Sequence, residues 1–249
     1  MFTFHPLPET PRDRLIFALD VDDLDTAERY VRMLAPHVGL FKVGPILYTS
    51  AGPMVLDLIH GSGAGCFLDL KFHDIPATVA SAAREAARRR VRMFTVHALG
   101  GRKMIEGASS ELMRMTVVPG VPRPMCLGVT ILTSHDEADL AEIGLPGPIA
   151  AQGLRLARLA VSAGAAGIVA SARELASLRA QLPPSTLFVT PGIRGAKDPH
   201  GDQARVVSAR EAIEAGATYL VVGRPIRDAS DPAGAAQRIL DEIGAARAS

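Results

Sequence analysis

Short apolar segments alternate with amphipathic segments along the chain, and this alternation most restricts its fold. The apolar segments have the length of β-strands, and the amphipathic segments have helical spacing. Eight such units in 249 residues predict a parallel sheet covered by helices and closed into one (β/α)8 TIM barrel over residues 1–249, with 1–13 as a lead segment. A doubly wound open sheet remains the alternative, although no Gly-x-Gly-x-x-Gly follows the first strand. The expected strands are 15–20, 40–44, 66–72, 92–98, 125–132, 167–170, 187–190 and 219–222, and the expected helices are 24–36, 54–60, 76–90, 101–113, 149–163, 171–182, 204–215 and 231–246.

The charge balance argues against polyanionic partners. Lys and Arg number 27 against 26 acidic residues, so the net charge of +1 creates no positive field that would collect nucleic acid or an anionic membrane. Only 4% of residues are aromatic, which leaves few platforms on which single-stranded bases could stack. We therefore expect neither a nucleic acid nor a membrane partner.

The cysteines and the hydropathy suggest a reducing compartment. Cys66 and Cys126 both fall in apolar, strand-like runs, where cysteine usually serves as a small buried hydrophobe rather than in a disulfide. No apolar stretch has the length of a membrane span, and the N-terminus lacks a basic-then-apolar signal segment. A cytoplasmic protein is expected.

Two charged residues interrupt the apolar strand at 66–72. Side chains alternate along a strand, so Asp69 and Lys71 share one face, and His73 joins them if the extended geometry persists that far. Because burying an unpaired charge is costly, the two charges should face each other and a polar cavity. Asp74 follows the strand, where its direction is not determined. A structural ion pair and a functional site both remain possible on these residues alone.

Polar residues also occur at or just after the ends of most other predicted strands. In a (β/α)8 barrel the catalytic face is built at these carboxyl ends and in the loops that leave them. Repetition on most strands indicates a single site. The residues are Asp20, Lys42, Asp69, Lys71, His97, Thr133 and Arg194.

The end of the last strand suggests a phosphate site. Gly223 would let backbone N–H groups approach an anion, and the Arg224 guanidinium would offer forked donors to phosphate oxygens. The alternative is a plain turn. The long Gly-rich loop at 191–203 leaves the same face and can close over a ligand, with Arg194 and Gln203 as contacts.

The histidines do not form a metal-binding pattern. His60, His135 and His200 are scattered without ligand spacing. His73 and His97 lie nearer the expected site, but no open set of carboxylates surrounds them, and their role is left unassigned. We expect no bound metal, and no Ser-His-Asp arrangement is evident.

A set of motifs across nearly the whole chain resembles one family. Phe67-Leu68-Asp69-Leu70-Lys71-Phe72-His73-Asp74-Ile75-Pro76, with Thr78 after it, is similar to the signature of the orotidine 5'-phosphate decarboxylases. Further matches, in order, are Phe17-Ala18-Leu19-Asp20, Phe41-Lys42-Val43-Gly44, Leu132-Thr133-Ser134, residues 190–194, and Val222-Gly223-Arg224-Pro225. One departure is Ala77, where the family often has Asn.

The resemblance implies a homodimer and a role for several of the matched residues. Asp74 and Thr78 would reach into the partner's site. The residues that would serve their own subunit are Asp20, Lys42, Asp69 and Lys71. The implied substrate contacts are Asp20 and Lys42 at the ribose, Thr133 at the pyrimidine, and Arg194, Gln203, Gly223 and Arg224 at the phosphate, with Asp69, Ile75 and Thr78 in the same binding set.

The implied reaction is decarboxylation of orotidine 5'-monophosphate to UMP, the last step of de novo pyrimidine nucleotide synthesis. Loss of CO2 leaves a C6 carbanion that the ring delocalises poorly, so charge must be stabilised where it develops. Lys71, oriented by Asp69 and Asp74, would stabilise and then protonate that carbanion, and Lys42 completes the catalytic set. Asp69 would also crowd the departing carboxylate. No metal, nicotinamide or pyridoxal is expected.

Two rival functions remain. Sugar-phosphate decarboxylases and hexulose-phosphate synthases share the Asp-x-Lys-x-x-Asp pattern but depend on magnesium and typically carry an acidic residue where Lys42 stands. A barrel that only binds phosphorylated nucleotides would keep the pocket without turnover. Chelator sensitivity separates the first rival, and a catalytic assay separates the second.

Overall fold

Eight parallel strands close on themselves in the structure, a computed structural model that describes residues 7–116, 121–194 and 207–247. β1 pairs with β2 on one side and with β8 on the other, which completes the ring. The predicted closed barrel is confirmed, and the doubly wound open sheet is wrong. The strands are β1 Leu15–Ala18, β2 Leu40–Val43, β3 Gly65–Phe72, β4 Met93–His97, β5 Met125–Val129, β6 Gly167–Val169, β7 Leu187–Thr190 and β8 Tyr219–Val222.

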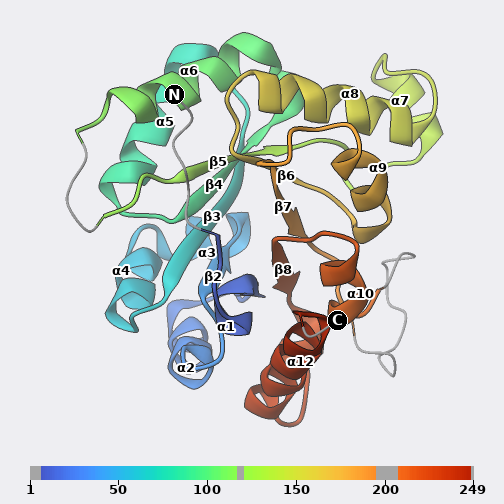
Figure 1. Ribbon diagram of the computed structural model, residues 1–249. Helices are drawn as coiled ribbons and strands as arrows, with labels where there is room; N and C mark the ends of the chain where they lie inside the picture. Colours follow the sequence, from blue (N-terminus) through green and yellow to red (C-terminus); the bar gives the residue numbers. More distant parts are fainter. Residues whose placement is uncertain (1–6, 117–120, 195–206, 248–249) are drawn as a thin grey trace.

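Helices lie around the strands, as Figure 1 shows, and cover the outer face of the sheet. They are α1 Pro11–Arg14, α2 Leu24–Leu34, α3 Pro45–Ala51, α4 Met54–Gly61, α5 Pro76–Arg88, α6 Gly101–Arg114, α7 Glu137–Glu142, α8 Ile149–Ser162, α9 Leu175–Arg179, α10 Ala209–Glu214, α11 Arg224–Arg227 and α12 Pro232–Arg247, with 3-10 turns at Ala98–Gly100 and Ala172–Glu174. In the described part of the chain, none of these helices is both long enough and apolar enough to cross a membrane.

Four short helices were not expected from the sequence, namely α1, α3, α7 and α11. The longest of them has 7 residues, which is too short for apolar periodicity to emerge. Local capping explains why they form. In α1, which begins inside the predicted lead segment, Thr10 Oγ1 accepts from the N–H of Asp13, and the Asp13 carboxylate accepts from the N–H of Thr10. Pro45 and Pro225 similarly occupy the first turns of α3 and α11.

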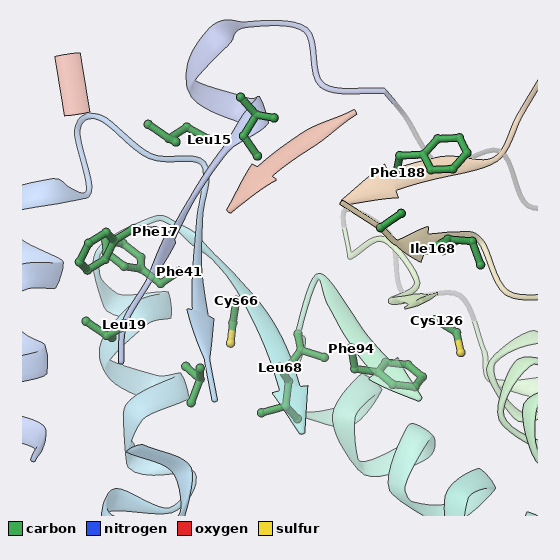
Figure 2. Close-up of a cluster of buried hydrophobic side chains, with 14 of the residues drawn as sticks. Leu15, Phe17, Leu19, Phe41, Cys66, Leu68, Phe94, Cys126, Ile168 and Phe188 are labelled. Atoms are coloured by element: carbon green, nitrogen blue, oxygen red, sulfur yellow. The ribbon is translucent and has the colours of Figure 1, made fainter. Parts of the chain in front are cut away.

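Two apolar layers sandwich the sheet. One set of strand residues faces the helices, and Figure 2 shows several of its side chains, among them the rings of Phe17 and Phe41, whose centroids lie 6.1 Å apart. The alternate set fills the barrel interior: Ile16, Ala18, Leu40, Phe67, Met93, Met125, Leu127, Leu187, Val189, Tyr219 and Val221. Both faces are apolar because the helices cover the outside while the strands pack against one another inside.

The interior alternation explains the position of the polar residues. On β1 the interior residues Ile16 and Ala18 are followed two residues later by Asp20. On β2, Lys42 follows the interior residue Leu40 by two positions, and on β3, Asp69 follows Phe67 by two positions. The apolar interior therefore ends in a charged layer at the carboxyl ends of the strands.

Both cysteines are free and buried in the outer apolar layer, as predicted for small buried hydrophobes (Figure 2). Burial raises the pKa of the Cys126 thiol to about 12 and also raises the pKa of Cys66. Both thiols therefore stay protonated at neutral pH and act as packing groups rather than nucleophiles.

Gly167→Ala should destabilise the barrel by about 1–3 kcal/mol, because the site is already fully packed. A Cβ atom at this position would overlap the Leu187 carbonyl oxygen on the adjacent strand and lie 2.7 Å from Leu187 Cβ. Gly61→Ala is the control, because nothing lies within 4 Å of its Cβ position at the end of α4. Guanidinium unfolding should give a lower midpoint for Gly167→Ala alone, and equal midpoints would contradict this packing argument.

Candidate active site

Four side chains of alternating charge form a continuous chain at the carboxyl ends of β1, β2 and β3. Lys42 Nζ lies 2.9 Å from Asp20 Oδ1 and 3.8 Å from Asp69 Oδ2. Lys71 Nζ lies 3.1 Å and 3.0 Å from the two carboxylate oxygens of Asp69. The sequence prediction that Asp69 and Lys71 face each other is confirmed.

Burial differs between the middle and the ends of this charged chain. The side chains of Lys42 and Asp69 are only 13% and 14% exposed, whereas those of Lys71 and Asp20 are 36% and 44% exposed. A largely desolvated charge is tolerated only beside an opposite charge, and each central residue has its closest one in an outer member, at 2.9 Å for Lys42 and 3.0 Å for Asp69. The outer members keep access to solvent or to a ligand.

These groups line one cavity of about 360 Å³ at the top of the barrel. That volume suits a small molecule. The structure brings together around it most of the residues that the sequence predicts for the site: Asp20, Lys42, Asp69, Lys71, Thr133, Arg194, Gly223 and Arg224. Their roles in binding and catalysis stay predictions.

Three other predicted residues do not line this cavity. Asp74, Ile75 and Thr78 lie where β3 passes into α5, and all three are exposed. Asp74 Oδ1 accepts a hydrogen bond of 2.6 Å from the N–H of Ile75. Gln203 and most of the predicted 191–203 loop lie outside the described residues.

The backbone at Lys71 is not a regular strand. Its φ of +49° is left-handed, which costs a residue other than glycine roughly 1–2 kcal/mol. The pairing of β3 with β4 also shifts register between Leu68 and Phe72. The alternation of side chains along a strand therefore predicts correctly that Lys71 lies on the same face as Asp69. It does not predict the left-handed backbone and the register shift that orient the Lys71 side chain.

Thr95, a buried residue of β4, contacts both members of the Asp69–Lys71 pair. Its hydroxyl accepts a hydrogen bond of 2.9 Å from the N–H of Lys71 and donates one of 2.9 Å to Asp69 Oδ1. The sequence prediction omitted Thr95. The available signal was its interior position, two residues after Met93.

The histidines near Lys71 form a stack rather than a ligand set. Because β3 ends at Phe72, as predicted, the exposed His73 leaves the strand and stacks on His97, with ring centroids 5.5 Å apart. Burial, followed by the charges of His73, His135 and Lys71, lowers the pKa of His97 and favours its neutral form. Within the described ranges, no group of three or more His, Cys, Asp or Glu residues could hold a metal.

Two further charged residues line the cavity and were not predicted. Glu174 accepts from the N–H and hydroxyl of Ser171 in a capping box, which the Ser-x-x-Glu spacing could have revealed. Arg227 Nη1 donates to the backbone carbonyl of Asp20 at 3.0 Å. Arg227 lies one helical turn after Arg224, so the two side chains are near each other only because α11 is helical. The sequence analysis did not predict this helix.

Fold and cavity together define a (β/α)8-barrel enzyme with a charged small-molecule site at the carboxyl ends of its strands. Residues 13–239 match the family described as orotidine 5'-phosphate decarboxylase / HUMPS. The chain belongs to this family.

Individual relatives agree with the family match. The orotidine 5'-phosphate decarboxylase of Syntrophotalea carbinolica is 50% identical over 94% of this chain and 96% of its own length. That of Geobacter sulfurreducens is 47% identical over 93% and 96% of the two chains. The crystal structure of the Lactobacillus acidophilus enzyme superposes with a TM-score of 0.82 at 38% identity, covering 92% of this chain and 98% of that one.

Proposed function

We propose that this protein converts orotidine 5'-monophosphate to UMP and CO2, the last step of de novo pyrimidine nucleotide synthesis. The observation that carries the proposal is the Lys71 ammonium group, held 3.0 Å from Asp69 Oδ2 in a cavity that Arg194 and Arg224 also line. Membership of the decarboxylase family supports it. A cytoplasmic location is part of the proposal and is supported by the two free, buried thiols.

The cavity offers a suitable group to each part of the nucleotide. Arg194, Gly223 and Arg224 would bind the phosphate, since guanidinium groups and exposed backbone N–H groups are good phosphate ligands. Asp20 and Lys42 would contact the ribose, and Thr133 the pyrimidine. Binding energy from the remote phosphate would then serve to hold C6 beside Lys71.

The chemistry needs one positive charge and one proton. The bond between C6 and the carboxylate breaks, CO2 leaves, and the bonding electron pair stays on C6. The Lys71 ammonium stabilises that pair and then donates a proton to C6, which gives UMP and a neutral amine that regains its proton from water. Asp69 orients the ammonium through its two contacts and crowds the departing carboxylate. Because Lys71 supplies both charge and proton, the mechanism requires no cofactor.

The second acid for Lys71 would come from another subunit of a homodimer. Three exposed residues do not line the cavity of their own chain, namely Asp74, Ile75 and Thr78. Ile75 is apolar, yet it is 66% exposed to solvent. A partner that covers this segment would bury Ile75 and receive Asp74 and Thr78 into its own site. Such a contact is reciprocal in a two-fold dimer.

Purified protein should convert orotidine 5'-monophosphate to UMP with EDTA present, as followed by the change in ultraviolet absorbance. An inert protein that still binds UMP would instead favour a nucleotide-binding barrel. Loss of turnover with EDTA and its return with Mg²⁺ would favour the magnesium-dependent relatives. The presence of Lys42, bonded to Asp20 at 2.9 Å, favours the metal-independent reaction.

A further inference from the structure

We propose that Thr95 is a positioning residue, whose hydroxyl holds the Asp69 carboxylate and the Lys71 backbone in the relative arrangement that aims the Lys71 ammonium. Thr95 is fully buried and does not line the cavity, so it acts through its two neighbours rather than on a ligand. The inference rests on the proposed decarboxylation and assigns to it a residue of β4.

The irregular pairing of β3 with β4 explains why a side chain is needed there. Leu68 pairs with Phe94 and Phe72 pairs with Val96, so residues 69–71 of β3 face a single residue of β4, Thr95. The regular ladder cannot supply a backbone partner for every group in such a mismatch. The Thr95 hydroxyl takes over this function by accepting from the N–H of Lys71 at 2.9 Å. That bond holds Lys71 in its left-handed conformation, with φ of +49°.

The direction of the hydrogen bonds makes the link specific. A threonine hydroxyl has one proton to donate, and a backbone N–H can only donate. Because Thr95 Oγ1 accepts from Lys71, its own proton is free to go to Asp69 Oδ1, at 2.9 Å. One hydroxyl therefore connects the backbone of Lys71 to the carboxylate that binds the side chain of Lys71.

Two lysine ammonium groups, those of Lys71 and Lys42, lie near the Asp69 carboxylate. The orientation of the carboxylate therefore decides which of them it holds more tightly. Lys71 Nζ contacts both of its oxygens, whereas Lys42 Nζ lies 3.8 Å from Oδ2 only. The Thr95 hydroxyl is a second donor on Oδ1, beside Lys71 Nζ, and it opposes rotation of the carboxylate toward Lys42. Since small displacements of a reacting group cause large rate losses, loss of this donor should reduce catalysis rather than binding.

Thr95→Val removes the hydroxyl and keeps the shape of the side chain. We expect kcat to fall about 10- to 100-fold, because a hydrogen bond to a charged group is lost, while KM and UMP binding change less than about 3-fold. Thr95→Ser keeps the hydroxyl and should restore most of the wild-type kcat. Thr186→Val is the matched control, since Thr186 is also buried but its hydroxyl has no hydrogen-bond partner among the described residues. Its kcat and KM should match wild type.

The outcomes separate this inference from the proposed function. Wild-type protein that does not decarboxylate orotidine 5'-monophosphate would overturn both. Active wild type with an equally active Thr95→Val variant would overturn the role of Thr95 alone. So would a Thr95→Ser variant as impaired as Thr95→Val, since that would reveal a packing effect. If Thr95→Val does not fold, Thr95→Ala carries the same comparison, because it removes the hydroxyl without placing a methyl group beside Asp69.

Discussion

Lys71→Ala should abolish turnover of orotidine 5'-monophosphate, with kcat reduced by about 10⁴-fold or more. On the proposed mechanism, the variant would lose both the positive charge beside C6 and the proton that C6 must receive. UMP should still bind, because Arg194, Gly223 and Arg224, the cavity residues proposed to bind its phosphate, are unchanged. Initial rates and a direct titration with UMP measure the two effects separately.

Lys103→Ala is the control for this substitution, because it removes an exposed lysine from α6 without touching the cavity. Its kcat and KM should equal those of wild type. A Lys71→Ala variant that keeps more than a few per cent of wild-type kcat would contradict the role given to the ammonium group. Loss of UMP binding in a folded variant would instead make Lys71 a binding residue.

Mixing Lys71→Ala subunits with Asp74→Ala subunits should restore activity that neither variant has alone. In the proposed dimer, the site of the Asp74→Ala subunit would keep its own Lys71 and would receive an intact Asp74 from its partner. Random exchange makes about half of the dimers mixed, each with one intact site, so about one quarter of all sites should recover. Rates measured after subunit exchange, against each variant alone, test this.

A second mixture distinguishes residues shared across the dimer from residues of one subunit. Asp69 contacts Lys71 within the same chain, at 3.0 Å. Lys71→Ala mixed with Asp69→Ala should therefore recover nothing, since each site then lacks one of the two. Two outcomes would count against the shared site. One is no recovery of activity in the mixture of Lys71→Ala with Asp74→Ala, once mass measurement has verified the heterodimers. The other is equal recovery in both mixtures.

The sequence by itself determined the barrel and most of the charged residues around its cavity. Eight apolar segments alternating with helices leave few arrangements that bury both faces of a parallel sheet. The two-residue period of each strand then carries Asp20, Lys42 and Asp69 to the interior, just above the last apolar layer. Both signals are local, so they can be read along the chain.

Only the tertiary structure decided how the charged residues are held. The left-handed backbone of Lys71 and the hydroxyl of Thr95 meet because β3 and β4 lose register there, over a separation of 24 residues. Arg227 reaches the carbonyl of Asp20 across 207 residues, where the barrel closes. No periodicity encodes such meetings, because they depend on the relative register of strands, which pairing and packing determine together.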